Sequence, residues 1–245
     1  MHPRSRDSHT AGPDAPIPSN AVLVATDAWR GAFPGAVVGA LVMRGVRNPE
    51  ENRALEAAKR RLEEKLRAAG DPDGEPILRA YVDYYRARGK TYHVKAQRES
   101  VALRGKPIPR RAALVEAMYM AELRNLILTA GHDLDALTLP LRADVTADGD
   151  RYVLLNGAEA VLERGDMLMA DGAGIVSSVL RGPDQRSRIT RETDGVLFAV
   201  YAPAGIGEAA VRRHLDGVRA NVQLVAPDAQ SEALLTLAGT RSAPR

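Results

Sequence analysis

The sequence predicts a mixed α/β (α+β) fold, in which antiparallel or mixed sheet layers are covered by helices. Helical apolar stripes occupy the first part of the chain, whereas short extended runs separated by turn residues follow Asp135. The chain has 245 residues, of which 45% are hydrophobic. This length and apolar content are sufficient for a sizeable buried core, and they exclude an intrinsically disordered protein.

The N-terminal part contains two predicted strands. Ala21–Thr26 is a short apolar run, and Trp29 to Pro34 read as a turn. Ala36–Arg44 is an unbroken run of small and β-branched residues, as in a strand that is buried on both faces. Gly45–Asn48 then turns the chain.

Three helices are expected next. Pro49–Ala69 has an apolar stripe, with Pro49 in the first turn and Asn48 as a possible cap. Its Lys59-Arg60-Arg61 run is read as a solvated face, with nucleic-acid binding as the alternative. Ile77–Arg88 carries three tyrosines, for which core packing is preferred over base stacking. A short helix at Glu99–Leu103 leads into a buried helix, Arg110–Leu128, which is expected to end near Thr129–Gly131 and to be followed by a turn.

The remainder of the chain is predicted to be mainly strands. Asn156-Gly157 is a strong hairpin signal. Gly207–Arg219 is expected to be an amphipathic helix, Val222–Val225 an edge strand and Ser231–Leu237 a last helix. The candidate strands are Leu139–Ala143, Tyr152–Leu155, Met167–Met169, Ile175–Leu180 and Val196–Tyr201.

Composition limits the classes of function. The absence of Cys excludes disulfides, a thiol nucleophile and Cys-ligated zinc. The net charge of +3 permits nucleic-acid binding. Most cations are Arg, which suits phosphate contacts, although an Ala- and Arg-rich composition also follows from a GC-rich genome. No apolar run is long enough for a membrane span. Residues 1–20 lack an apolar signal core and are expected to be a flexible tail of a cytoplasmic protein, with residues 241–245 as a second tail.

Motifs for common catalytic sites are absent. No two of the five His are spaced as a metal pair, and neither a phosphate-binding nor a dinucleotide-binding loop is present. Ser177-Ser178 is not surrounded by a nucleophile elbow. We therefore predict no metal and no cofactor. His132 is the exception, because the adjacent Asp133 could orient its ring; the competing interpretation is that both residues only cap a turn.

Several short motifs together resemble one family. Gly105–Arg110 reads GKPIPR, and His132–Asp135 reads HDLD, separated by a helix of matching length. Phe33-Pro34-Gly35, Arg44–Asn48 (RGVRN), Leu155–Gly157 (LNG) and Arg186–Thr193 extend the match over about residues 33–203. This pattern resembles the B3/B4 domain, the editing and tRNA-binding-like module of the phenylalanyl-tRNA synthetase β subunit, and especially freestanding proteins built from it.

The resemblance implies a B3/B4-type fold, with residues 21–240 as a single domain of two intertwined halves. In the synthetase this module hydrolyses the ester of a wrongly attached amino acid on its tRNA, in a pocket between the halves. The resemblance thus implies binding of tRNA, aminoacyl-tRNA or an aminoacyl-adenosine-like ligand, with trans-editing hydrolysis as a possible activity. ATP-dependent aminoacylation and a membrane partner are not expected. The alternatives are a non-catalytic RNA-binding or regulatory module and a small-molecule-binding protein that reuses the pocket.

Some positions depart from the family pattern. Ala130 stands where the synthetase has its pocket His, and Ala112 stands in place of a helix Asn. The later strand, which contains Ala199, lacks the acidic residue that recognises the tyrosine hydroxyl. The predicted catalytic residues are His132 and Glu116. The predicted ligand-binding residues are Tyr119, Asp133, Asp135, Ser177, Ser178 and Arg181.

Overall fold

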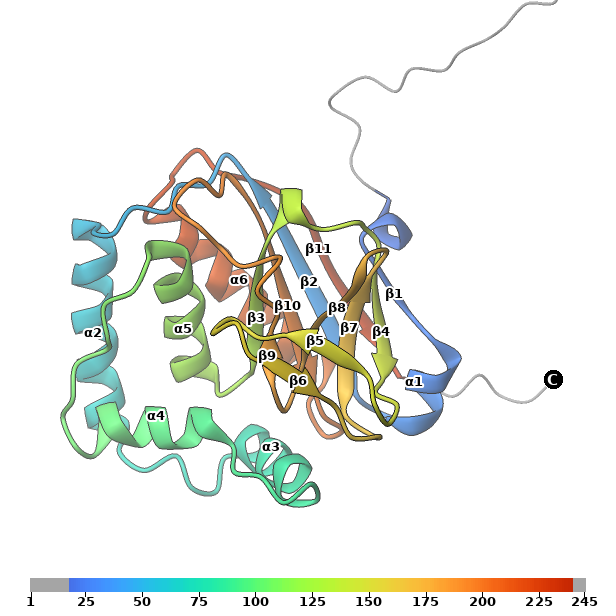
Figure 1. The fold of residues 1–245 in the computed structure, drawn as a ribbon. Coiled ribbons are helices and arrows are strands. Elements are labelled where there is room, and N and C mark those ends of the chain that lie inside the picture. The colour runs from blue at the N-terminus through green and yellow to red at the C-terminus, as the bar shows by residue number, and fades with distance from the viewer. Residues whose placement is uncertain (1–17, 240–245) are drawn as a thin grey trace, which may run out of the picture.

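The computed structural model describes residues 18–239, in which two β-sheets pack face to face and helices flank one side (Figure 1). The mixed α+β class predicted from the sequence is confirmed. The tails predicted at residues 1–20 and 241–245 lie outside the described residues, apart from residues 18–20. The strands are β1 (Leu23–Ala25), β2 (Val37–Arg44), β3 (Thr129–Asp133), β4 (Leu141–Val145), β5 (Arg151–Val153), β6 (Glu159–Val161), β7 (Met167–Asp171), β8 (Gly174–Ser178), β9 (Gly182–Pro183), β10 (Gly195–Ala202) and β11 (Gln230–Ala238).

The four-stranded sheet has the order β11-β2-β10-β3, and all of its pairs are antiparallel. Its central strands β2 and β10 are almost entirely buried, as their unbroken apolar runs predict. On the outer face, a Cβ at Gly39 would lie 2.7 Å from Val211 Cγ1 and 3.0 Å from Leu215 Cδ1. Glycine at this position therefore allows a helix to approach the sheet closely.

The five-stranded sheet has the order β1-β4-β7-β8-β9. β1 runs parallel to β4, and the other pairs are antiparallel, so this sheet is mixed. Strands β5 and β6 form a separate hairpin, with Gly157 at a φ of 83° in the turn between them. The hairpin that Asn156-Gly157 predicted is thus confirmed.

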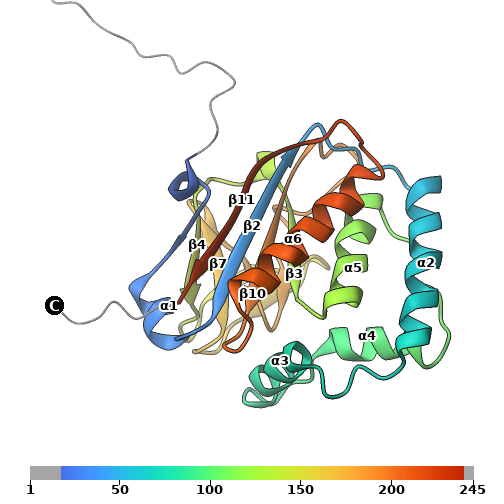
Figure 2. The ribbon, with the colours of Figure 1, turned by 180° about the vertical axis from the view of Figure 1, so that it is seen from behind.

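The helices form layers beside the four-stranded sheet (Figure 2). Helix α6 crosses the outer face of the sheet, α5 lies beside α6, and α2 lies outside α5. No helix among residues 18–239 combines the length and apolar content needed to cross a membrane. The helices are α1 (Asp27–Ala32), α2 (Arg53–Ala69), α3 (Pro76–Arg86), α4 (His93–Ala102), α5 (Ala113–Asn125) and α6 (Glu208–Gln223), with 3-10 turns η1 (Ser19–Ala21) and η2 (Leu134–Ala136).

The tyrosines of α3 lie in the core, in agreement with the core-packing interpretation. The Tyr81 hydroxyl donates to the Tyr201 carbonyl and accepts from the Leu128 amide. The Tyr84 hydroxyl donates to Asp166 and accepts from the Met167 amide. The third, Tyr85, donates to the Val179 carbonyl at 2.7 Å. Their polar ends are therefore satisfied inside the protein and are not available for base stacking.

Three segments, two of them at the end of the central helix α5, differ from the predicted secondary structure. Helix α5 ends at Asn125 because Leu126 adopts a left-handed conformation with a φ of 57°. Residues Thr129–Asp133, predicted as the end of a helix and a turn, instead form β3 and pair with β10. A short helix, α1, replaces the predicted turn near Trp29.

Two further differences concern helix starts and the C-terminal region. Asn52, rather than Asn48, caps α2 by accepting from the Leu55 amide at 3.0 Å. The C-terminal helix predicted at Ser231–Leu237 is instead part of the edge strand β11. The edge strand predicted at Val222–Val225 is not formed, because these residues are the end of α6 and the turn after it. In β11 both faces are half-exposed, so its apolar residues lack the alternation that would distinguish a strand from a helix.

The burial of α5 predicts a large effect of truncating Leu123. This side chain has no exposed surface and packs in the cluster between α2 and α5. We expect Leu123→Ala to lower the free energy of unfolding by about 2–5 kcal/mol, measured by denaturant titration. Leu103→Ala is the control, because Leu103 is 53% exposed. A loss below about 0.5 kcal/mol at Leu123 would contradict the packing of α5.

Candidate functional site

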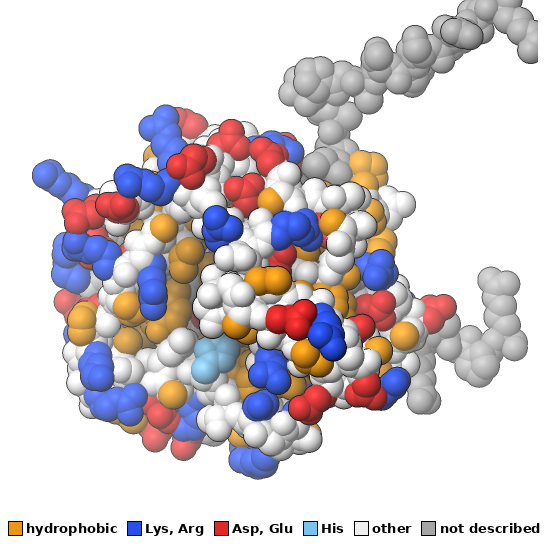
Figure 3. Space-filling view, in the orientation of Figure 1, with side chains coloured by type: hydrophobic (Ala, Val, Ile, Leu, Met, Phe, Trp, Pro, Cys, Tyr) orange, Lys and Arg blue, Asp and Glu red, His pale blue; other side chains and the backbone are white. Residues whose placement is uncertain are grey.

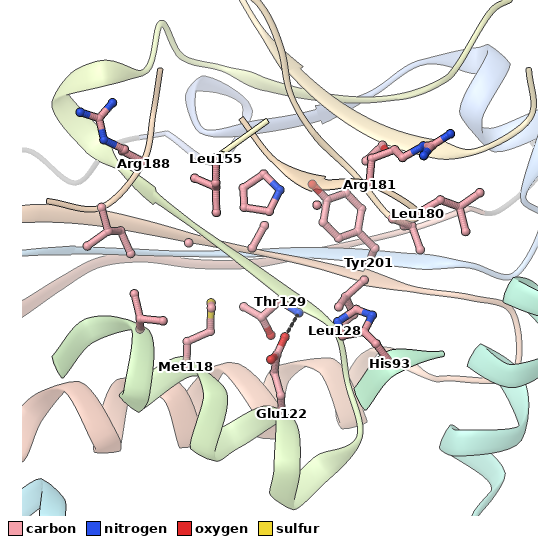
Figure 4. A pocket seen from close by; sticks show the side chains of 18 residues that line it. His93, Met118, Glu122, Leu128, Thr129, Leu155, Leu180, Arg181, Arg188 and Tyr201 are labelled. Atoms are coloured by element: carbon pink, nitrogen blue, oxygen red, sulfur yellow. Dashed lines mark hydrogen bonds between the residues drawn. The ribbon is translucent and has the colours of Figure 1, made fainter. Parts of the chain in front are cut away.

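A cavity of about 550 Å³ lies between α5 and the strands beside it (Figure 4). β3 is the edge of the four-stranded sheet and β9 is the edge of the five-stranded sheet, and both contribute to its wall. The remaining walls come mainly from α5, the β8–β9 turn, Leu155 in the turn between β5 and β6, the segment after β9 and the end of β10. The lining residues are His93, Val115, Met118, Glu122, Leu128, Thr129, Ala130, Gly131, Leu155, Ser178, Val179, Leu180, Arg181, Gly182, Pro183, Arg188, Ile189 and Tyr201.

Glu122 is the buried acid of this cavity. It projects from α5 towards β3, where one carboxyl oxygen accepts from the Thr129 amide at 2.7 Å (Figure 4). Burial raises the pKa of the Glu122 carboxyl to about 8, although the Thr129 hydrogen bond acts in the opposite direction. The second oxygen makes no hydrogen bond within the described part of the chain. Glu122 can therefore accept a bond from a ligand or hold a proton near neutral pH.

Cations mark the outer part of the same cavity. Arg181 and Arg188 both line it and are exposed to solvent. Neither forms an ion pair with any acid in residues 18–239; the Arg188 guanidinium donates to the Gln185 carbonyl at 3.0 Å. Figure 3 shows hydrophobic side chains in the hollow over α5, with Lys and Arg side chains around it. The cavity thus combines an apolar lining, an internal acid and guanidinium groups at its opening.

Tyr201 forms part of the wall, and a buried chain of hydrogen bonds lies behind it. Its hydroxyl bonds to Ser177, whose Oγ lies 3.5 Å from His132 Nε2. On the other side of the imidazole, Nδ1 lies 2.7 Å from Ser187 Oγ.

The donor and acceptor in each of these hydrogen bonds follow from the last bond, that of Ser187. The Ser187 hydroxyl donates to Asp184, so His132 Nδ1 must be the donor to Ser187 and Nε2 must be an acceptor. Burial lowers the pKa of His132 to about 4, which agrees with a neutral ring at pH 7. The Ser177 hydroxyl then donates to Nε2, and the Tyr201 hydroxyl donates to Ser177. This arrangement orients Tyr201 as a fixed wall of the cavity.

The sequence-predicted residues fall into three groups. Ser178 and Arg181 line the cavity, whereas Ser177 and His132 lie behind Tyr201 and are fully buried. The third group lies elsewhere and consists of Asp133, Asp135, Glu116 and Tyr119. Ala130, at the position of the synthetase's pocket His, lines the cavity; Ala112 is the N-cap of α5, and Ala199 pairs with Ala130 within the sheet.

The two Asp residues of the HDLD motif support the end of β3. Asp133 accepts from the Asp135 amide at 3.1 Å and from the Thr193 hydroxyl at 2.5 Å. Asp135 is exposed and pairs with Arg44 at 3.4 Å. Asp133 therefore caps a turn, which was one of the two interpretations of this motif. His132 does not cap the turn and instead takes part in the buried chain of hydrogen bonds behind Tyr201.

Glu116 lies on the opposite face of α5, towards α2. Its carboxylate pairs with Lys59 at 2.8 Å and accepts from the Arg111 amide at 2.5 Å, with both ion-pair side chains buried. Tyr119 is half-buried and packs against the same α2–α5 cluster. Neither residue is among those that line the cavity. The observed contacts of Glu116 are those of a structural ion pair between helices.

Glu122, Arg188 and Tyr201 line the cavity but are not among the residues predicted from the sequence. Glu122 had a usable signal, because Val115, Met118 and Glu122 recur at helical spacing and share one face of α5. The Glu116 position is six residues away from Glu122 and therefore points to another face. Tyr201 carried no such signal, since it closes an apolar strand.

Breaking the Glu116–Lys59 pair tests this structural role. Glu116→Gln removes the buried one of the two carboxylates that pair with Lys59, while Glu56, also 2.8 Å from the ammonium, remains. We therefore expect the free energy of unfolding to fall by about 1–3 kcal/mol. Ligand affinity should be unchanged in the folded fraction. Glu64→Gln is the control, because Glu64 is an exposed glutamate on α2. A variant of normal stability that has lost ligand binding would return Glu116 to the site.

The raised pKa of Glu122 predicts a pH dependence of stability. The folded-state pKa of about 8 exceeds the ordinary value of 4.5, so the unfolded chain releases this proton first as pH rises. The stabilising contribution of the protonated group is full below the unfolded pKa and is lost as pH rises through about 8. Relative to Glu122→Gln, the wild-type protein should lose up to about 1.4 kcal/mol per pH unit within this window. Urea titrations of both proteins between about pH 5 and pH 8 check this, and a constant difference would contradict it.

Comparisons with known proteins give only weak structural likenesses. No protein-family model matches the chain, and no curated protein matches it. An N-terminal fragment of the phenylalanyl-tRNA synthetase β subunit from Pyrococcus horikoshii is similar in structure, with a TM-score of 0.47 and 11% sequence identity. The match covers 84% of this chain and 49% of the fragment, so the chain spans about half the length of that protein. A similarity of this size carries no information about the ligand, which has to be inferred from the cavity itself.

Proposed function

We propose that the cavity binds the aminoacylated end of a tRNA, where an amino acid is esterified to the terminal ribose. The observation that carries this proposal is the presence of buried Glu122 and of Arg181 and Arg188 at the opening of one cavity. The ammonium group of a bound amino acid favours the charged form of the Glu122 carboxyl, although burial alone keeps this group protonated near neutral pH. Guanidinium groups pair with phosphate. An aminoacyl nucleotide carries both of these charges, one at each end.

The remaining lining suits the uncharged parts of such a ligand. Val115 and Met118 of α5, together with Leu155 and Ile189, provide an apolar surface for an amino-acid side chain. A volume of about 550 Å³ lies within the range of small-molecule pockets. The GKPIPR and HDLD motifs support the same assignment through their resemblance to the B3/B4 domain.

Hydrolysis of the bound ester is the second part of the proposal. Water adds to the ester carbonyl carbon, the bond to the ribose oxygen breaks, and that oxygen takes a proton. Since His132 has no exposed surface and Ser177 is engaged by Tyr201, the protein would act by positioning and electrostatics rather than through a nucleophile. His132 is a positioning residue in this scheme, because it reaches the cavity only through Ser177 and Tyr201.

The binding proposal predicts a specific loss of amine recognition in Glu122→Gln. The probes are a non-hydrolysable, amide-linked aminoacyl-adenosine and the same compound without its α-amine. Losing a charge-assisted hydrogen bond of about 1.5–3 kcal/mol should weaken binding of the amine-bearing probe by roughly 10–150-fold. Affinity for the probe without the amine should remain unchanged, as measured by calorimetry. The control is Glu64→Gln, an exposed residue on α2.

The same proteins are then tested in a deacylation panel of mischarged tRNAs. Release of the amino acid by the wild type, reduced in Glu122→Gln, supports hydrolysis. Tight binding of the probe without release leaves the chain as a binding module. Equal losses for both probes in Glu122→Gln would contradict amine recognition. Binding of uncharged RNA alone would favour the RNA-binding alternative, and salt-independent binding of a small neutral ligand would favour the small-molecule alternative.

A further inference from the structure

A second, smaller groove adjoins the opening of the cavity. Leu180 and Arg181 line both hollows, so the two share one wall. The groove has a volume of about 290 Å³ and lies between the end of α3 and the segment that precedes β7. Its other lining residues are Ala87, Arg88, Lys90, Leu162, Glu163, Arg164 and Asp166.

The groove has an excess of positive charge. Its lining contains four cationic and two acidic side chains. One acid, Asp166, is buried and accepts hydrogen bonds from the Tyr84 hydroxyl and the Leu180 amide. Its charge is therefore directed into the protein. The other, Glu163, is the single exposed acid among the lining residues.

The cations differ in their freedom to bind a ligand. Lys90 and Arg181 form no ion pair within residues 18–239, whereas Arg164 pairs with Asp148 at 3.2 Å on the surface. An exposed pair of this kind contributes little to stability, so it is readily exchanged for a ligand contact. Two exposed cations are thus fully available at this groove.

Arg88 supplies a charge that is already fixed in place. Its Nε and Nη2 donate to the Gly165 carbonyl at 3.0 and 2.7 Å, and Nη1 donates to the Tyr84 carbonyl at 2.9 Å. The guanidinium also lies 3.7 Å from the centre of the Tyr84 ring. Since these contacts are all to uncharged groups, the positive charge of Arg88 is not neutralised and contributes to the potential of the groove.

We propose that this groove binds the sugar–phosphate backbone of the single-stranded nucleic acid that precedes the nucleoside held in the cavity. The inference rests on the proposed function, because Leu180 and Arg181 line both the cavity and the groove, so a nucleic acid whose end lies in the cavity passes next to the groove. None of the groove residues is aromatic, and Arg88 covers the neighbouring Tyr84 ring. Contacts are therefore to phosphates rather than to stacked bases, and recognition of this segment is independent of its sequence.

The experiment compares a probe that reaches the groove with one that does not. The longer probe is a labelled single-stranded RNA whose 3′ end carries the amide-linked amino acid, and the shorter probe is the aminoacyl-adenosine analogue alone. Lys90→Ala should weaken RNA binding several-fold and reduce the slope of log affinity against log salt by about 0.7, as for one lost phosphate contact. Affinity for the shorter probe should not change. Lys65→Ala on α2 is the matched control, because Lys65 is also an exposed lysine for which no ion pair is seen in the described chain.

Each other outcome overturns a defined part of the inference. If Lys90→Ala and Lys65→Ala bind the RNA equally well, while the shorter probe still depends on Glu122, the groove is excluded and the cavity assignment stands. If a polyglutamate peptide binds with the same dependence on Lys90 as the RNA, the groove is a general polyanion site and the nucleic-acid assignment fails. If wild-type protein binds neither probe, both the groove and the proposed function are excluded.

Discussion

The hydroxyl groups of three tyrosines on α3 set the spacing of the two sheets next to the cavity. Tyr81 bonds to the backbone of β10 and to Leu128 before β3, both on the side of the four-stranded sheet. Tyr84 bonds to Asp166 and Met167 at the start of β7, in the other sheet. A buried hydroxyl that loses its partner is destabilising by about 1–3 kcal/mol, so the sheets cannot slide or separate here without large losses. One helix therefore holds both walls of the cavity in register.

The two faces of α5 border different surroundings, the α2 packing interface on one side and the cavity on the other. On the α2 side, Lys59 and Glu116 form a buried pair whose charges compensate each other. On the cavity side, Glu122 has only an amide as its partner, which is why burial dominates its pKa. Glu116 is thus held in an ion pair at the α2 interface, whereas Glu122 has one oxygen without a protein partner at the cavity. The difference comes from the neighbouring elements and not from the helix itself, and it explains why the motif position of Glu116 did not identify the cavity.

Sequence patterns predicted the elements whose burial is uniform and missed those whose burial is mixed. β2 and β10 are buried along their length, so continuous apolar runs identified them. β3 has the sequence TAGHD, in which burial depends on partners far along the chain, such as Ser187 for His132. Of the residues predicted to bind a ligand, Ser178 and Arg181 line the cavity. Glu122 was missed because a single acid within an apolar helix is usually assigned to a solvated face. Only the structure shows that α5 is covered by β3, α6 and α2, so that Glu122 is buried.

The small residues of β3 determine which elements supply the chemistry of the cavity. Ala130 contributes only a methyl group to the cavity wall, and Gly131 contributes no side chain at all. A Cβ at Gly131 would lie 2.8 Å from Ile189 Cδ1 and 3.4 Å from Met118 Sδ, so the absence of a side chain lets these two apolar groups close that end of the cavity. β3 thus contributes shape, and its Thr129 amide is bonded to Glu122. The charged groups of the cavity come from α5, the β8–β9 turn and the segment after β9, which supply Glu122, Arg181 and Arg188 respectively. Any ligand selectivity must therefore arise from the balance between apolar contact on one side and Glu122 with the arginines on the other, since no charged group of β3 faces the ligand.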